Sequence, residues 1–159
     1  MAELNVGAPA PPFRVPSVTR QGETEMSLDD FRGKSSVVLY FYPKDDTPGC
    51  TTQACGFRDQ YADFQAAGSA ILGISPDDQA SHVQFADKYA LPFPLLADPD
   101  HAVAEAYGVW KEKNNYGKTY MGIERTTFVI DRDGKIAKIY PRVKVDQHAD
   151  AVLEFVKTL

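Results

Sequence analysis

The sequence predicts an α/β fold in which helices flank both faces of a mixed central β-sheet. The first indication is an apolar run, residues 37–42, which is long enough for a buried strand and too short for a membrane span. A second apolar run, residues 70–75, would pair with it in parallel across a connecting helix, in a right-handed βαβ unit. The third is a pair of strand patterns, residues 126–130 and 135–140, joined by a turn that contains Gly134. Their antiparallel pairing would make the sheet mixed.

The chain before this central unit predicts extended structure. Residues 8–16 are rich in proline, which is typical of an edge strand or an extended segment. A turn at Gly22 would lead into a second short strand at residues 23–28. Residues 27–31 resemble a single capped helical turn.

Helices and strands are expected to alternate after residue 42. Apolar residues recur there at a helical spacing of three, four and three: Ala54, Phe57, Tyr61 and Phe64. Further helices are expected at residues 81–89, 101–107 and 146–157. Residues 92–97 would lead into a short strand, and the polar stretch 111–118 is expected to be the longest loop.

Length and composition predict one globular domain over residues 1–159. Hydrophobic residues make up 43% and charged residues 25%, as is usual in a soluble protein. The net charge of −5 argues against nucleic acid as a partner. No apolar run approaches the ~18 residues of a membrane span, and residues 1–6 show no secretory signal. Two cysteines suggest reactive use in a reducing, cytoplasmic compartment.

The helix after residues 37–42 has a start signal that brings a cysteine to its first turn. Thr47 is a good N-cap, and Pro48 suits the first helical position because its missing N–H would have no partner there. Gly49 would let a second group approach the backbone closely. Cys50 would lie among unpaired N–H groups at the positive end of the helix dipole, which favours a thiolate.

The helix dipole alone is not enough to make this sulfur anionic. A helix terminus supplies only ~0.3–1 kcal/mol, rarely ~2. We therefore expect a cation beside Cys50. It would have to outweigh Asp45 and Asp46, which we interpret as solvated loop charges.

The second cysteine, Cys55, lies five residues after Cys50 on the same predicted helix. Five residues along a helix rise ~7.5 Å, and a disulfide needs Cα atoms within ~7 Å. The spacing also places the two side chains on different faces of the helix. The two cysteines therefore cannot bond until the first turns unwind, so a bond between them would belong to a reaction cycle.

The motif Pro43-x-x-x-Thr47-x-x-Cys50 resembles the active-site signature of peroxiredoxins. The longer string over residues 42–59, with its second cysteine, is similar to the bacterioferritin comigratory protein, or PrxQ, subfamily, and the resemblance extends almost end to end. It implies a thioredoxin-like fold and a thiol peroxidase that reduces hydrogen peroxide and organic hydroperoxides through a cysteine sulfenic acid. It also implies thioredoxin or glutaredoxin as the reductant, a monomer, and no cofactor or metal.

The same resemblance, joined to the chemistry of peroxide cleavage, assigns roles to five residues. Cys50 would be the peroxidatic nucleophile, and Cys55 would resolve its sulfenic acid as an intramolecular disulfide. Thr47 would hydrogen-bond the peroxide, and Pro43 would shield the sulfur from water. Arg125, at the start of a predicted strand, would be the cation. The resemblance selects it, because sequence spacing alone does not distinguish it from the other arginines.

Two other functions remain open for these residues. A disulfide oxidoreductase of thioredoxin type would need Cys-x-x-Cys, whereas the spacing here is Cys-x₄-Cys. A metal-binding module, as in copper-delivery proteins, would use Cys50, Cys55 and one histidine. Three histidines show no ligand spacing and are expected at the surface: His82, His101 and His148. Trp110 is expected to pack in the core or on the surface.

Overall fold

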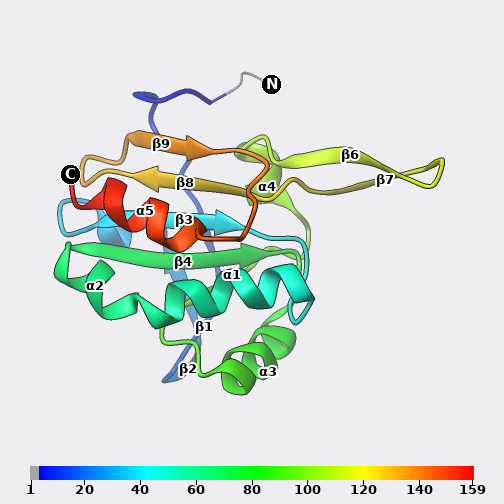
Figure 1. Cartoon of the computed structure of the whole chain (residues 1–159), viewed down its shortest axis with the longest axis horizontal. Helices are drawn as coiled ribbons and strands as arrows, with labels where there is room; N and C mark the ends of the chain where they lie inside the picture. The colour runs from blue at the N-terminus through cyan, green and yellow to red at the C-terminus, as the bar shows by residue number, and fades with distance from the viewer. Residues whose placement is uncertain (1–3) are drawn as a thin grey trace.

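The computed structural model describes residues 4–159. The sequence predicts no secretory signal in residues 1–6, and the first three of these lie outside the described residues. The described chain forms a seven-stranded sheet and a separate two-stranded hairpin (Figure 1). None of the helices found in residues 4–159 combines the length and the apolarity that crossing a membrane requires.

The strands are β1 (Arg14–Thr19), β2 (Gly22–Ser27), β3 (Ser36–Phe41), β4 (Ser69–Ser75), β5 (Leu95–Ala97), β6 (Trp110–Asn115), β7 (Lys118–Ile123), β8 (Thr126–Ile130) and β9 (Ile136–Tyr140). The helices are the 3₁₀ turn η1 (Leu28–Phe31), α1 (Pro48–Asp59), α2 (Tyr61–Ala66), α3 (Gln79–Tyr89), α4 (Ala102–Ala106) and α5 (His148–Val156).

The large sheet has the strand order β2-β1-β5-β4-β3-β8-β9. β3 pairs in parallel with β4, with Val37 opposite Ala70, and antiparallel with β8, with Val37 opposite Ile130. Every residue of β3 is buried, because the strand has a neighbour along each edge and a layer on each face. The mixed sheet and the βαβ unit predicted from the sequence are therefore confirmed.

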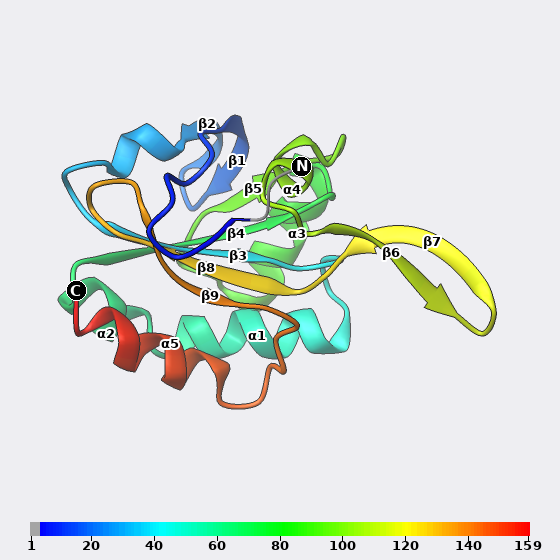
Figure 2. The same ribbon diagram turned by 90° about the horizontal axis from the view of Figure 1, so that it is seen from above.

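Helices cover both faces of the sheet (Figure 2). On one face, α1, α2, α3 and α5 enclose an apolar cluster that includes Val38 and Tyr40 of β3. On the other face, α4, η1 and the N-terminal segment enclose a second cluster that includes Leu39 and Phe41. Successive residues of a strand point to opposite faces, so β3 contributes to both clusters. The predicted arrangement of helices on both faces is confirmed.

The prediction of a loop at residues 111–118 is wrong. Residues 111–115 belong to β6, residues 116–117 form a turn, and Lys118 begins β7. The two strands pair antiparallel and project from the body of the molecule (Figures 1 and 2). The turn residues Tyr116 and Gly117 have φ of 54° and 80°, as in the tight turns whose twist matches that of the flanking strands. Residues 114–120 are exposed, so no alternation of apolar and polar residues marked them as strands.

The helix predicted after β3 is divided into α1 and α2. Gln60 separates them, with φ −112° and ψ 13°. Its side-chain Nε2 donates a hydrogen bond to the Asp150 carboxylate of α5. Phe57 of α1 and Phe64 of α2 are nevertheless both fully buried in the same cluster. The apolar spacing therefore predicted the buried face correctly but not the break in the backbone.

Candidate active site

The loop between β3 and α1 brings the predicted site residues to one end of the sheet. Thr47 is the N-cap residue of α1, and Pro48 is the first helical residue, as the sequence predicted. The Thr47 hydroxyl donates a hydrogen bond to the Lys44 carbonyl at 2.9 Å, so it does not cap the helix with its side chain. Pro43 lies half-buried in the same loop. The prediction that Thr47 is the N-cap residue is therefore confirmed, but its hydroxyl bonds to the loop and not to the helix.

The sulfur of Cys50 is buried and has a cation beside it. Cys50 is 1% exposed, and Nη2 of Arg125 donates to its Sγ at 3.2 Å. A Cβ at Gly49 would lie 3.1 Å from the same Nη2. The prediction that a second group approaches the backbone closely at Gly49 is confirmed, and that group is the Arg125 guanidinium.

Gln53 is a site residue that the sequence analysis missed. Its Oε1 accepts a hydrogen bond from Nη1 of Arg125 at 2.6 Å. The side chain is buried, and its Nε2 has no partner among the described residues. A residue three positions after Cys50 shares its face of the helix, so the spacing could have identified it.

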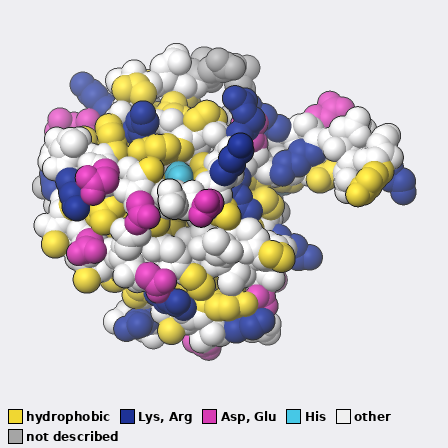
Figure 3. All heavy atoms as spheres, in the orientation of Figure 1, with side chains coloured by type: hydrophobic (Ala, Val, Ile, Leu, Met, Phe, Trp, Pro, Cys, Tyr) yellow, Lys and Arg dark blue, Asp and Glu magenta, His cyan; other side chains and the backbone are white. Residues whose placement is uncertain are grey.

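Arg125 lies between the hairpin and the central sheet, after β7 and before β8. Its carbonyl accepts a hydrogen bond from the Val143 N–H at 2.9 Å, which fixes the backbone from which the guanidinium extends. Partial burial and the charge of Arg125 hold the pKa of Lys113, on the hairpin, below its usual value. Lys and Arg side chains gather beside the root of the hairpin (Figure 3).

Two neutral aromatic groups lie close to the sulfur and the guanidinium. Burial, followed by the charges of Cys50 and Asp45, raises the pKa of Tyr40 well above its usual value, so the phenol stays protonated. Burial, and to a smaller extent the Arg125 charge, lowers the pKa of His148 to about 4. The site therefore combines a cation at the sulfur with two nearby side chains that carry no charge near neutral pH.

Several polar residues predicted at the surface are buried instead. His82 is 0% and His148 7% exposed, so the expectation of surface histidines is wrong for both. Asp45 is also buried, and its carboxylate lies 2.7 Å from Nδ1 of His82. Asp46 is exposed, as predicted, and pairs with Lys88. The physical reason in each buried case is a polar partner within the fold.

The two cysteines are free, as expected for an intact α1. Cys50 is buried, whereas Cys55 is half-buried further along the helix. In the part of the chain that the structure describes, the close group of potential metal ligands consists of Asp45, Asp77 and His82 and includes neither cysteine.

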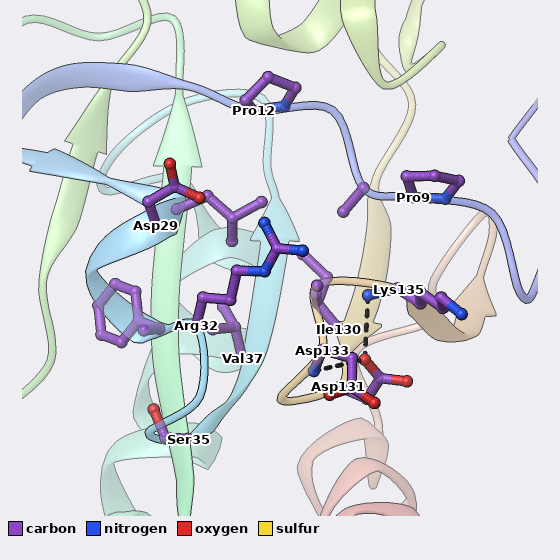
Figure 4. A pocket seen from close by; sticks show the side chains of 14 residues that line it. Pro9, Pro12, Asp29, Arg32, Ser35, Val37, Ile130, Asp131, Asp133 and Lys135 are labelled. Carbon is purple, nitrogen blue, oxygen red and sulfur yellow. Dashed lines mark hydrogen bonds between the residues drawn. The ribbon is translucent and has the colours of Figure 1, made fainter.

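A cavity of about 350 Å³ lies at the other end of the sheet (Figure 4). Its lining includes Val37, near the start of β3, and Ile130, the last residue of β8. Cys50 follows the opposite end of β3. The cavity contains none of the site residues predicted from the sequence, so it is separate from the Cys50 site.

Comparison with known proteins places this arrangement in a family. The profile of the AhpC/TSA family matches residues 6–139. The chain is 54% identical to the putative peroxiredoxin bcp of Coxiella burnetii, over 94% of this chain and 97% of that protein. It is 47% identical to peroxiredoxin Bcp of Bacillus subtilis, over 98% of this chain and 97% of that one. The chain belongs to the peroxiredoxins, in the Bcp/PrxQ subfamily.

A solved structure of this peroxiredoxin subfamily has the same fold. The bacterioferritin comigratory protein of Xanthomonas campestris, a protein studied for its alkyl peroxide reduction activity, aligns with a TM-score of 0.83. It is 43% identical, and the alignment covers 91% of this chain and 90% of that protein. The thioredoxin-like fold implied by the sequence resemblance is therefore confirmed.

Proposed function

We propose that Cys50 is the nucleophile of this thiol peroxidase, and that its thiolate attacks the terminal oxygen of hydrogen peroxide or an organic hydroperoxide. The new S–O bond gives a cysteine sulfenic acid while the O–O bond breaks. The leaving hydroxide or alkoxide takes up a proton and departs as water or alcohol. The observation that carries this proposal is the 3.2 Å contact between the Arg125 guanidinium and the buried Cys50 sulfur.

Arg125, Thr47 and Pro43 would serve the same step in different ways. The guanidinium and the Cys50 N–H would stabilise charge that spreads over the two peroxide oxygens in the transition state. The Thr47 hydroxyl would hydrogen-bond the peroxide, and Pro43 would keep water from the sulfur. The position of Thr47 and Pro43 in the loop directly before Cys50 supports these roles.

Cys55 would resolve the sulfenic acid. Its sulfur attacks Cys50 Sγ, so that the S–S bond forms, the S–O bond breaks and water leaves. The two residues lie on one intact helix, and its geometry keeps them too far apart to bond. The first turns of α1 must therefore unwind before resolution.

A thiol reductant must return the disulfide to two thiols, and we propose thioredoxin or glutaredoxin for this step. The half-buried position of Cys55 near the surface supports access by a protein dithiol. We further propose that the protein acts as a monomer in the cytoplasm, where such reductants are kept reduced. Peroxide is the oxidant and this dithiol is the electron donor, so each cycle reduces one peroxide and forms one disulfide in the reductant.

Intact mass after one equivalent of hydrogen peroxide tests the two cysteine roles. We expect the protein to lose two hydrogens, as an internal disulfide requires, and the Cys55→Ser variant to gain one oxygen instead. The variant should consume one equivalent of peroxide quickly and then turn over slowly or stop. Full turnover of Cys55→Ser with thioredoxin would disprove the resolving role of Cys55. Rapid peroxide consumption by Cys50→Ser would disprove the assignment of Cys50 as the nucleophile.

A further inference from the structure

A buried network ties the loop before α1 to α3. Its centre is the carboxylate of Asp45, whose Oδ1 accepts a hydrogen bond from the Tyr42 hydroxyl at 2.6 Å. Oδ2 accepts from the Ser81 hydroxyl at 2.8 Å and lies 2.7 Å from Nδ1 of His82. The Asp45 side chain is 4% exposed and the His82 side chain 0%. The Asp45 carboxylate is therefore bonded both to Tyr42, directly after β3, and to two residues in the first turn of α3.

The hydrogen-bond geometry requires a proton between Asp45 and His82. Nε2 of His82 lies 2.8 Å from the Leu96 carbonyl oxygen, which can only accept, so Nε2 carries a hydrogen. Nδ1 faces a carboxylate oxygen, and two bare lone pairs at 2.7 Å would repel each other. A second proton therefore lies between them, and the pair is joined by a charge-assisted hydrogen bond away from water.

The backbone of Asp45 is held independently of its side chain. Its N–H donates to Oδ2 of Asp77 at 2.8 Å, and the Ser75 hydroxyl donates to the same oxygen at 2.7 Å. None of these partners belongs to α1. The loop is thus attached to the end of β4 and to α3 by contacts that do not involve the helix that follows.

The first turn of α1 has a different kind of support. Its first backbone bond runs from the Thr51 N–H to the Thr47 carbonyl at 2.8 Å. Arg125 adds the bonds to Cys50 and Gln53 described above. Each of these contacts has Cys50, Thr51 or Gln53 as one partner. These three residues must move when Cys55 approaches Cys50, so the contacts are lost together on unwinding.

We propose that the buried Asp45–His82 pair is an anchor that confines the unwinding of α1 to residues after Thr47. Pro43 and Thr47 then keep their places while Cys50 leaves and returns, so the pocket does not have to be rebuilt in each cycle. Asp45 and His82 are positioning residues, because they act through the loop and do not touch the sulfur. This inference rests on the proposed resolution by Cys55.

Hydrogen exchange of the reduced and the peroxide-oxidised wild-type protein tests the anchor without a substitution. The amides of residues 51–55 should lose protection by about tenfold or more on oxidation. The Asp45 amide, bonded to Asp77, should keep its protection within about twofold. Loss of protection at Asp45 equal to that at Thr51 would overturn the proposal.

Two matched variants separate the anchor from the rest of the loop. Asp45→Asn keeps the shape of the side chain but removes its charge. In this variant we expect the segment that loses protection on oxidation to extend back to the amide of residue 45, and peroxide oxidation to slow about tenfold. Asp46→Asn alters the exposed contacts of the next residue with Lys88 and Tyr89 of α3. Because water screens these contacts, we expect the extent of the unprotected segment and the rate of peroxide oxidation to stay within about twofold of the wild type. Equal effects of the two substitutions would overturn the proposal.

The failure of this inference is distinct from the failure of the proposed function. If oxidation gives no loss of two hydrogens, no internal disulfide forms and resolution by Cys55 is wrong. If the disulfide forms and the Asp45 amide nevertheless loses protection, the resolution step stands and the anchor is wrong. The wild-type measurement decides this point even if Asp45→Asn is too unstable to study.

Discussion

At Arg125, a single side chain joins the Cys50 sulfur to another residue of the helix that carries it. Its two terminal nitrogens donate to Cys50 Sγ at 3.2 Å and to Gln53 Oε1 at 2.6 Å. A planar guanidinium can hold both partners at once, whereas a lysine ammonium is a point charge on a flexible stem. Arg125 is therefore placed both to favour negative charge at the sulfur and to hold the first turn of α1 closed.

We expect Arg125→Ala to slow the oxidation of Cys50 by peroxide about 10²-fold or more. Alkylation by a small reagent such as iodoacetamide should slow far less. It needs only the thiolate, whereas peroxide cleavage also needs a hydrogen-bond donor to the two peroxide oxygens in the transition state. Stopped-flow rates for both reactions check this. Arg20→Ala, at an exposed arginine, is the control and should change neither rate. Equal losses in the two reactions would count against the role given to Arg125.

His148 should make the stability of the protein depend on pH. Burial lowers its pKa from 6.5 to about 4, so the folded protein keeps this ring neutral where the unfolded chain binds a proton. Stability is therefore highest above pH 6.5 and falls as the pH drops toward 4. Between pH 7.5 and pH 5 we expect this residue alone to lower the free energy of unfolding by about 2 kcal/mol.

Urea unfolding of the reduced protein at these two pH values measures the change. The comparison variant is His148→Gln, which cannot titrate and should lack this part of the pH dependence, although it is less stable at pH 7.5 because Thr127 loses its ring partner. A pH dependence of the same size in both proteins would rule out His148 as its source.

At the scale of the elements, the proposed cycle requires an α1 that is stable enough to present Cys50 and weak enough to open. Its first turn combines a proline, a glycine and two threonines, Thr51 and Thr52, and all but the N-terminal proline are poor helix formers. Thr52 also bonds back to the Pro48 carbonyl at 3.0 Å, which slightly disfavours a regular helix. The composition of this turn therefore lowers the cost of unwinding.

Substitutions at the exposed Thr52 should change the rate of disulfide formation through helix stability. Alanine and glycine differ by about 1 kcal/mol in a helix interior, so Thr52→Ala should form the disulfide about fivefold more slowly than Thr52→Gly. The initial oxidation of Cys50 should be alike in both variants, because Thr52 is exposed. Quenched-flow thiol trapping followed by mass measurement gives both rates.

Ala62→Gly, in an exposed position of α2, is the matched control for these variants. It carries the same change in helix propensity outside the segment that unwinds, so it should lower overall stability and leave disulfide formation unchanged. Identical disulfide rates for Thr52→Ala and Thr52→Gly would mean that this turn stays helical during resolution.

Elements with local signals could be predicted, and those that depend on distant partners could not. The central strands β3, β4 and β8 carry apolar runs, and α1 begins with a threonine followed by a proline. The hairpin has no apolar alternation, so its strands resembled a loop. Asp45 and His82 are 37 residues apart, and each type is usually exposed or only partly buried, so their buried pairing needed the fold. Arg125 was found by resemblance alone.

On the scale of the whole molecule, the sheet and its two apolar clusters form the body, and the hairpin lies outside it (Figure 3). Tyr116 at its tip is 99% exposed. β6 and β7 pair only with each other in the described chain, and an isolated two-stranded hairpin is marginally stable at best. The hairpin therefore contributes little to the stability of the body.

Shortening the hairpin should leave the fold intact. Replacement of residues 114–119 by Asn-Gly would join Lys113 to Tyr120, which are already paired, through a turn sequence suited to that connection. The removed residues are all exposed, so we expect the free energy of unfolding to change by less than about 0.5 kcal/mol. Thermal or urea unfolding checks this, and a loss of several kcal/mol would show that the hairpin supports the body.

The root of the hairpin contains the single tryptophan of the chain. Trp110 lies flat on the imidazole of His101, with ring centroids 4.0 Å apart and planes 3° apart, and His101 directly precedes α4. All indole fluorescence of the protein therefore comes from this one stacked ring. Because stacking on an imidazole alters emission, the intrinsic fluorescence is a built-in optical label for the seating of the hairpin on α4, and it needs no added dye or engineered residue.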